Sequence, residues 1–176
     1  MRPYRFSSQA TWLILPANKR NIANNIMQLK LLLDTNVLVA GLSSRLGASF
    51  ALLEAVVQHR IKLAASATLW LEYEAVLKRD EIRALHGLKI ADVDAFLDGL
   101  ASLVTPIELH FTWRPQLRDA GDEMVLQAAV NGGVDALVTH NIADFEVAKD
   151  LFNLTLWTPA KALKALKQFE QTEKPK

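Results

Sequence analysis

Hydrophobic positions along the chain form short continuous runs that alternate with longer stretches at helical spacing. The short runs predict buried strands at "QLKLLL", "IKLAASA", "TPIELHF", "VDALVTH" and "LTLWTP". The periodic stretches predict helices at about 49–59, at "TLWLEYEAVLKRDEI", "KIADVDAFLDGLASLV", "RDAGDEMVLQAAVNGG" and "PAKALKALKQFEQ", with a turn and a short helix at "NIADFEVAKD". Strands and helices therefore alternate along the chain.

Several residues at the ends of these segments favour particular boundaries. Thr68 is a candidate N-cap for the second helix, and Asp119 is one for the helix that it precedes. Asn131-Gly132-Gly133 predicts a helix end, and Pro159 suits a first helical turn. Pro106 predicts that its strand lies towards an edge of the sheet.

The alternation of strands and helices predicts an α/β fold, a three-layer sandwich with a mostly parallel sheet of four or five strands. A chain of 176 residues with 51% hydrophobic residues is sufficient for one such domain. We place the domain at residues 28–170, with a flexible tail at 171–176. Residues 1–27 are interpreted as an extension outside the fold; the alternative is an arm that packs through Trp12 and Leu13.

Composition narrows the classes of protein only slightly. The net charge is +1, so a surface that binds nucleic acid would have to be local. The absence of cysteine excludes disulfides and thiolate chemistry and favours a cytoplasmic location. Apolar runs are too short to span a membrane, so no membrane association is expected.

Acidic residues follow the strands or open the helices that leave their carboxyl ends. Ligand sites in open parallel sheets form at that edge. The acidic and amide residues concerned are Asp34, Glu72, Asp119, Asp122, Glu123, Asn141 and Asp144. Because converging carboxylates repel one another and no matching cluster of Lys or Arg occurs, a hard divalent cation such as Mg²⁺ is the expected partner.

Four segments, in this order, give the chain a resemblance to a known family. They are "LLLDTNVLVAGL", "LWLEYEAVLKR", "RDAGDEMVLQAAV" and "ALVTHNIADF". Together they resemble the PIN-domain family, in particular the toxin-type ribonucleases of bacterial toxin–antitoxin systems. The resemblance covers roughly residues 29–160.

The resemblance implies a set of site residues. The matching positions are Asp34, followed by Thr35 and Asn36, then Glu72, Asp122 and Thr139. At Asn141 many relatives carry aspartate, so this chain lacks one negative charge there, which weakens metal attraction and leaves a second metal in doubt. Asp144, three residues later, is a candidate to compensate.

The resemblance also implies an activity, the Mg²⁺- or Mn²⁺-dependent hydrolysis of single-stranded RNA. Our hypothesis is in-line attack by metal-activated water, which leaves 5′-phosphate and 3′-hydroxyl ends. Family toxins are commonly homodimers silenced by a cognate antitoxin, so both are expected partners. Candidate RNA contacts are Arg45, Lys78 and Arg79.

Other interpretations remain open at this stage. Each acid has an ordinary structural role as a turn former, helix cap or solvated helix residue. Asn141 favours a non-catalytic PIN-like module that binds RNA or a protein partner. A haloacid-dehalogenase-type phosphohydrolase would also end its first strand on an aspartate, but it requires a second aspartate where this chain has Asn36.

Overall fold

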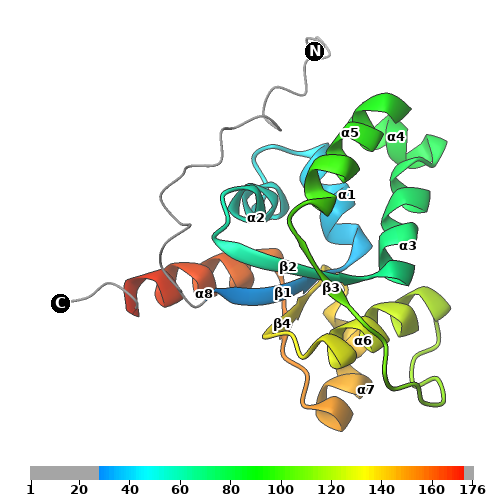
Figure 1. The fold of residues 1–176 in the computed structure, drawn as a ribbon, viewed down its shortest axis with the longest axis vertical. Coiled ribbons are helices and arrows are strands. Elements are labelled where there is room, and N and C mark those ends of the chain that lie inside the picture. Colours follow the sequence, from blue (N-terminus) through cyan, green and yellow to red (C-terminus); the bar gives the residue numbers. More distant parts are fainter. Residues whose placement is uncertain (1–27, 173–176) are drawn as a thin grey trace.

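A computed structural model describes residues 28–172 and places five parallel strands in one sheet (Figure 1). The strands are β1 (Leu29–Leu33), β2 (Ile61–Ser66), β3 (Val104–Ile107), β4 (Ala136–Val138) and β5 (Leu156–Trp157). Their order across the sheet is β3-β2-β1-β4-β5. The predicted α/β class, the parallel sheet and the range of four to five strands are confirmed, and Pro106 lies on an edge strand as predicted.

Eight helices connect the strands or flank the sheet within the described residues. They are α1 (Thr35–Ser43), α2 (Ala48–Val57), α3 (Ala67–Leu77), α4 (Asp80–His86), α5 (Ile90–Ala101), α6 (Ala120–Gly132), α7 (Ile142–Phe152) and α8 (Pro159–Thr172). In Figure 1, α1 to α5 lie on one side of the sheet and α6 and α7 on the other. The sheet is thus the middle layer of three.

Strand β1 lies at the centre of the sheet, between β2 and β4. Leu31, Leu32 and Leu33 are all at most 1% exposed, so side chains on both faces of this strand are buried. A continuous apolar run is what a central parallel strand requires, because helices cover both of its faces. The chain leaves β1 towards β2 on one side and enters β4 on the other, which makes the β1/β4 boundary the switch point of the topology.

Helix α1 begins directly after Asp34 and was not predicted from the sequence. Its segment, TNVLVAGLS, contains a glycine and β-branched residues, which weaken its helical pattern. Helices α1 and α2 pack closely at Gly41, where a Cβ atom would lie 2.6 Å from Leu53 Cδ1 and 3.2 Å from the Ser49 carbonyl oxygen. Tertiary packing therefore explains both the glycine and the helix.

The second predicted helix, from Thr68 to Ile82, is wrong in two respects. Its N-cap is Ser66, whose Oγ accepts a hydrogen bond from the Leu69 N–H, rather than Thr68. It also ends at Leu77, and α4 begins at Asp80 after an extended residue at Arg79. The sequence has neither Gly nor Pro at this break and so gave no stop signal.

Other predicted boundaries are confirmed. Asp119 caps α6 by accepting hydrogen bonds from the N–H groups of Gly121 and Asp122. Gly133 ends α6 in the left-handed conformation, at a φ of 51°, and Pro159 is the first residue of α8. Helix α7 runs for 11 residues and is longer than the short helix predicted after Asn141.

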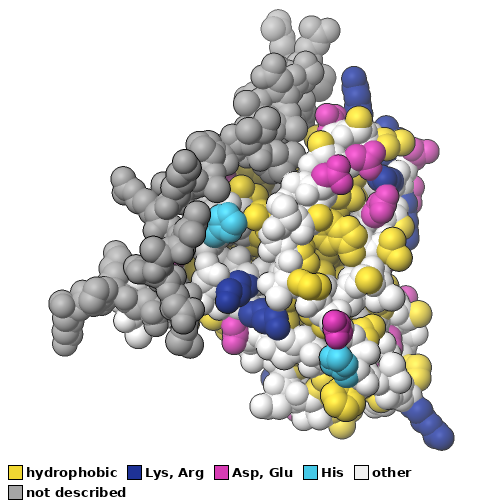
Figure 2. Space-filling model, in the orientation of Figure 1, with side chains coloured by type: hydrophobic (Ala, Val, Ile, Leu, Met, Phe, Trp, Pro, Cys, Tyr) yellow, Lys and Arg dark blue, Asp and Glu magenta, His cyan; other side chains and the backbone are white. Residues whose placement is uncertain are grey.

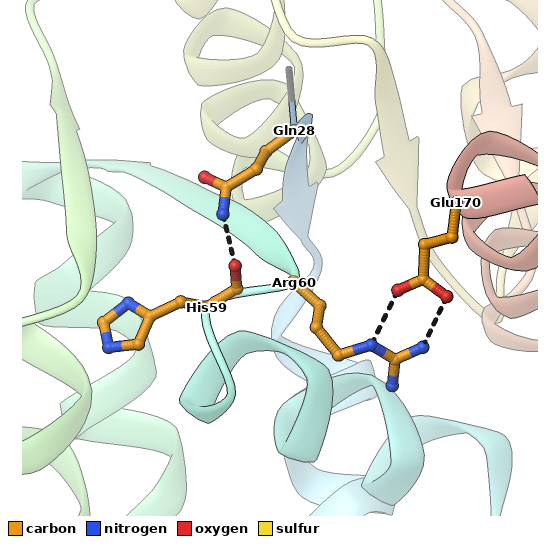
Figure 3. Close-up of polar contacts among 4 residues, drawn as sticks. All are labelled: Gln28, His59, Arg60 and Glu170. Atoms are coloured by element: carbon orange, nitrogen blue, oxygen red, sulfur yellow. Dashed lines mark hydrogen bonds and ion pairs between the residues drawn. The ribbon is translucent and has the colours of Figure 1, made fainter. Parts of the chain in front are cut away.

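Helix α8 lies after the last strand and is joined to the beginning of β2 by a two-bond ion pair (Figure 3). Arg60 donates from Nε and one terminal nitrogen to the two carboxylate oxygens of Glu170, at 2.7 and 2.9 Å. Nearby, the Gln28 amide donates to the His59 carbonyl. Ala162 and Leu166 are buried, so α8 packs against the same core. Residues 1–27 and 173–176, and with them the predicted extension and most of the predicted tail, lie outside the described residues.

Two further features of the described residues are the apolar content of the helices and the distribution of charge on the surface. Within residues 28–172, no single helix is long and apolar enough to cross a membrane; α1 and α2 pass that test only as a pair, bent by 100°. On the face shown in Figure 2, acidic and basic side chains are interspersed.

Candidate active site

Asp34 and Thr139 lie side by side at the carboxyl ends of the two strands that flank the switch point. Leu33 is paired with Val138 in the β1–β4 register, and each of the two polar residues comes next in its chain. The Asp34 N–H donates to the Val138 carbonyl at 2.9 Å. The register therefore places both side chains at the edge of the sheet where ligand sites form.

The Asp34 carboxylate is buried, at 6% exposure, and its Oδ2 accepts two side-chain hydrogen bonds. Thr139 Oγ1 donates to it at 2.6 Å, and Asn36 Nδ2 donates at 2.6 Å. Burial raises the pKa of Asp34, while the hydrogen bonds from Thr139 and Asn36 and the amides at the start of α1 oppose that rise. The carboxylate is thus fixed in position and still lacks full compensation for its burial.

Thr139 uses all its hydrogen-bonding capacity to order this site. Besides donating to Asp34, its hydroxyl accepts from Asn36 Nδ2 at 3.1 Å and from the Asn141 N–H at 2.9 Å. Its side chain is fully buried. Because one donor and two acceptors are all satisfied, the hydroxyl has a single favourable orientation, and the turn after β4 is fastened to Asp34.

The turn after β4 has two further attachments. The His140 N–H donates to Asn36 Oδ1 at 3.2 Å, so Asn36 joins both segments of the site. His140 Nε2 lies 2.9 Å from Oγ of Ser49, which is buried in α2. Thr35 is itself buried as the first residue of α1. Asn36 and Thr139 therefore have positioning roles around Asp34.

Asp122, in the first turn of α6, is electrostatically coupled to Asp34. Burial and the negative charges of Asp34, Asp119 and Asp144 raise the pKa of Asp122 to about 6. Three acids from different segments thus act on Asp122, and each of them opposes its ionisation. A cation at this position would relieve the repulsion.

A pocket of about 670 Å³ lies beside these acids. Asp119 and Asp122 of α6 line it together with Asn141 and Asp144, which flank the start of α7. The remaining lining residues are Gln116, Leu117, Arg118, Ala143 and Val147. The predicted residues Asp122, Asn141 and Asp144 therefore share one cavity.

The structure places other predicted site residues in different surroundings. Glu72 of α3 forms an ion pair with Arg79 at 3.9 Å and is not among the groups that raise the pKa of Asp122. Lys78 pairs with Glu74 at 2.5 Å and with Asp94 at 2.6 Å. Arg45 is exposed between α1 and α2. Neither Glu72 nor Lys78 is among the groups that shift the pKa of Asp34.

The donor set suits a hard divalent cation in its chemistry. Asp34, Asp122 and Asp144 offer carboxylate oxygens, and Asn141 offers an amide oxygen. Within residues 28–172, however, no three acidic or histidine side chains stand close enough together to hold a metal ion. Burial and the charges of three nearby acids disfavour the ionised form of Asp122, and a bound cation would favour it.

Two buried residues next to the site, Tyr73 and Glu123, were not predicted from the sequence to belong to it. Tyr73 of α3 is fully buried and donates its hydroxyl to the carbonyl of Leu33, the residue before Asp34. Burial and the charge of Asp34 raise the pKa of this hydroxyl, so it remains a donor. Glu123 is buried beside Asp122. Tyr73 lies on the apolar stripe of a helix and Glu123 in an acidic first turn, so neither carried a distinguishing signal.

We expect Tyr73→Phe to destabilise the protein by about 1–2 kcal/mol, because it removes the donor to a buried carbonyl. Urea denaturation measures the change. Ser43→Ala is a matched control, since it also deletes a hydroxyl bonded to a backbone carbonyl (Val39, 2.7 Å) but at an exposed site. It should change stability by less than about 0.5 kcal/mol. Equal losses in the two variants would contradict a special role for Tyr73.

Comparison with known proteins identifies the family. A model of the PIN domain matches residues 30–143, more than half of the chain, and this span contains Asp34, Glu72, Asp122 and Asn141. No curated protein matches the chain. PIN domains are generally nucleases, which indicates a hydrolase of nuclease type. On this match and on the site at the β1/β4 switch point, the chain belongs to the PIN-domain family.

Proposed function

We propose that this protein is a divalent-metal-dependent endoribonuclease that hydrolyses single-stranded RNA. The observation that carries the proposal is the coupling of Asp34 and Asp122 at the switch point. Asp34 is buried and fixed by Thr139 and Asn36. Burial, together with the charges of Asp34, Asp119 and Asp144, raises the pKa of Asp122 to about 6. Such perturbed carboxylates beside a pocket are typical of a catalytic site.

Asp34, Asp122 and Asp144, with the Asn141 amide oxygen, are the residues that would hold Mg²⁺ or Mn²⁺. When bound, the ion would lower the pKa of a water molecule and neutralise charge on the scissile phosphate. Glu72 would join this set only by giving up its ion pair with Arg79. This pairing of Glu72 with Arg79 favours one ion over two.

The chain's own residues prepare the site for this chemistry. Thr139 and Asn36 both donate to Oδ2 of Asp34 and so fix the orientation of the carboxylate. The turn 139–141, held by Asn36, carries Asn141 to the wall of the pocket. The pocket beside these groups is large enough for a nucleotide-sized part of the substrate, at about 670 Å³.

A proposal about the cellular role of the protein rests on the family resemblance alone. We propose that the protein is the toxin of a type II toxin–antitoxin pair, acts in the cytoplasm, forms a homodimer and is silenced by a cognate antitoxin. The order of the four sequence segments around the site supports this extension.

A second candidate function is a non-catalytic module that binds RNA or a protein partner. Asn141 favours it, because an amide replaces a carboxylate at the pocket wall. The absence of a three-acid group within the described residues also favours it. In such a module, Asn141→Asp should create cleavage, whereas in an active enzyme it should only change metal preference.

Cleavage of end-labelled single-stranded RNA tests the proposal. The purified protein should cleave with Mg²⁺ or Mn²⁺ and lose all cleavage in EDTA, and the products should carry 5′-phosphate and 3′-hydroxyl ends. Products with a 2′,3′-cyclic phosphate would contradict hydrolysis by activated water. No cleavage with either metal, by protein shown to be folded, would favour the binding module.

A further inference from the structure

A loop of residues 108–119, here called the pocket loop, joins β3 to α6 and runs back along α6. Asn131, near the end of α6, binds the first part of the loop. Its Oδ1 accepts from the N–H groups of His110 and Phe111, and its Nδ2 donates to the Phe111 carbonyl. The loop is therefore fixed at its far end before it reaches the pocket.

Glu123 binds the part of the pocket loop that lies beside the active site. One oxygen accepts from Trp113 Nε1 at 2.8 Å, and the other accepts from the N–H groups of Gln116 and Leu117, both at 2.9 Å. The side chain is buried, at 6% exposure, although it belongs to the acidic first turn of α6. A buried carboxylate with three donors from one loop is a dedicated attachment, not a solvated helix residue.

Trp113 extends this attachment to α7. Its ring packs against Phe152, with ring centroids 4.5 Å apart. The pocket loop is thus held to α6 through Glu123 and to α7 through Trp113. These two helices also carry the acids of the pocket.

The residues that Glu123 holds are themselves part of the pocket wall. Gln116 and Leu117 line the cavity, and Arg118 follows them on the same wall. Asp122, Asn141 and Asp144 line it as well. Glu123 thus attaches the loop segment that precedes Arg118 to α6, the helix that carries Asp122. Arginine on such a wall suits a phosphate of the substrate backbone.

We propose that Glu123 is a positioning residue for substrate binding, which holds the pocket loop so that Arg118 faces the RNA backbone next to the acidic site. This inference rests on the proposed ribonuclease function. Glu123 does not touch the reacting atoms, so its loss should weaken RNA binding more than it slows the chemical step.

Glu123→Gln tests the attachment with little change in size. A glutamine amide cannot accept from both sides, so its NH₂ group must face either the Trp113 N–H or the two backbone N–H groups. Amide exchange at Gln116 and Leu117 should become about tenfold faster, and the KM for a single-stranded RNA should rise about tenfold, with kcat changed by less than threefold.

Trp113→Phe in the Glu123→Gln background provides a rescue. It removes the indole N–H that opposes the glutamine NH₂ and keeps an aromatic ring against Phe152. Exchange and KM should return at least halfway towards the wild-type values. Lack of rescue in both measurements would overturn the assigned contact.

Asn131→Ala is the matched control, since it loosens the same loop about 12 Å farther along α6. It should speed exchange at 110–111 but leave KM within twofold of the wild type. An equal rise in KM for Asn131→Ala and Glu123→Gln would reduce Glu123 to a general structural role and overturn the proposal.

The design separates this inference from the proposed function. Amide exchange needs no activity, and anisotropy of a fluorescein-labelled single-stranded RNA gives a dissociation constant without turnover. If the wild type binds this RNA but does not cleave it, the nuclease proposal fails, and a tenfold weaker binding by Glu123→Gln still supports the positioning role. Unchanged exchange and unchanged binding in Glu123→Gln would overturn it.

Discussion

Asp34→Asn is expected to reduce RNA cleavage on the order of 10³-fold while the protein remains folded. Asparagine keeps the size of the side chain, and its amide oxygen can still accept from Thr139 and Asn36, which both donate to one oxygen of Asp34. The substitution removes the negative charge and replaces the second carboxylate oxygen by an NH₂ group. Because burial raises the pKa of Asp34, that charge does not favour folding, and the melting temperature should be unchanged or slightly higher.

Asp98→Asn is a matched control for this experiment, since it removes an exposed carboxylate from α5. It should cleave RNA at the wild-type rate. Cleavage by Asp34→Asn within tenfold of the wild type, by protein with an unchanged melting temperature, would show that Asp34 is not the centre of the site.

The strands were predictable because most are short and largely apolar, and the central strand β1 is buried on both faces at Leu31–Leu33. Helix α1 was not predictable from periodicity. Its Gly41 lowers helix propensity, and the reason for that glycine is the approach of Leu53 from α2, which only the fold reveals. The break between α3 and α4 falls at Arg79, where the sequence contains no helix breaker.

Site residues could be predicted where they directly follow a strand, because the end of a strand fixes their place at the edge of the sheet. Asp34 and Thr139 follow neighbouring strands, so the topology alone brings them together. Glu72 follows β2 within a helix, and the direction of its side chain depends on helix rotation and on Arg79. Tyr73 binds a backbone carbonyl 40 residues away, which local sequence does not reveal. Glu123 binds a loop only six to ten residues before it, but that loop has no regular pattern from which its path could be predicted.

Asp122→Asn is expected to change how the melting temperature of the protein depends on pH and on added metal. In the folded metal-free protein the pKa of Asp122 is raised to about 6, above its ordinary value of 3.8. The folded state therefore binds this proton more tightly than the unfolded chain does. The contribution of Asp122 to stability is fully present below pH 3.8 and is lost as the pH rises to about 6. Asparagine removes this loss, so above pH 6 the metal-free variant should melt at a higher temperature than the wild type.

With metal bound, the wild type should melt at a higher temperature than Asp122→Asn. A bound cation requires the ionised form of Asp122, which the folded protein otherwise disfavours. At Mn²⁺ concentrations about 100-fold above its dissociation constant, the wild type should gain about 2.7 kcal/mol, or roughly 5–10 °C in melting temperature. This gain should be large at pH 7 and small at pH 5, where Asp122 holds its proton. Asp122→Asn should show almost none of it at either pH, as measured by thermal melts with Mn²⁺ and with EDTA.

Asp119→Asn separates a metal ligand from a nearby charge. Asparagine at this position can still cap α6 through its side-chain oxygen, which now accepts from the N–H groups of Gly121 and Asp122, yet it removes one of the charges that raise the pKa of Asp122. This variant should keep most of the Mn²⁺-induced gain, with its pH dependence displaced to lower pH. If Mn²⁺ raised the melting temperature of the wild type and of Asp122→Asn equally, the cation would bind elsewhere. If Asp119→Asn and Asp122→Asn lost the Mn²⁺-induced stabilisation equally, the effect would come from the overall charge of the site and not from coordination by Asp122.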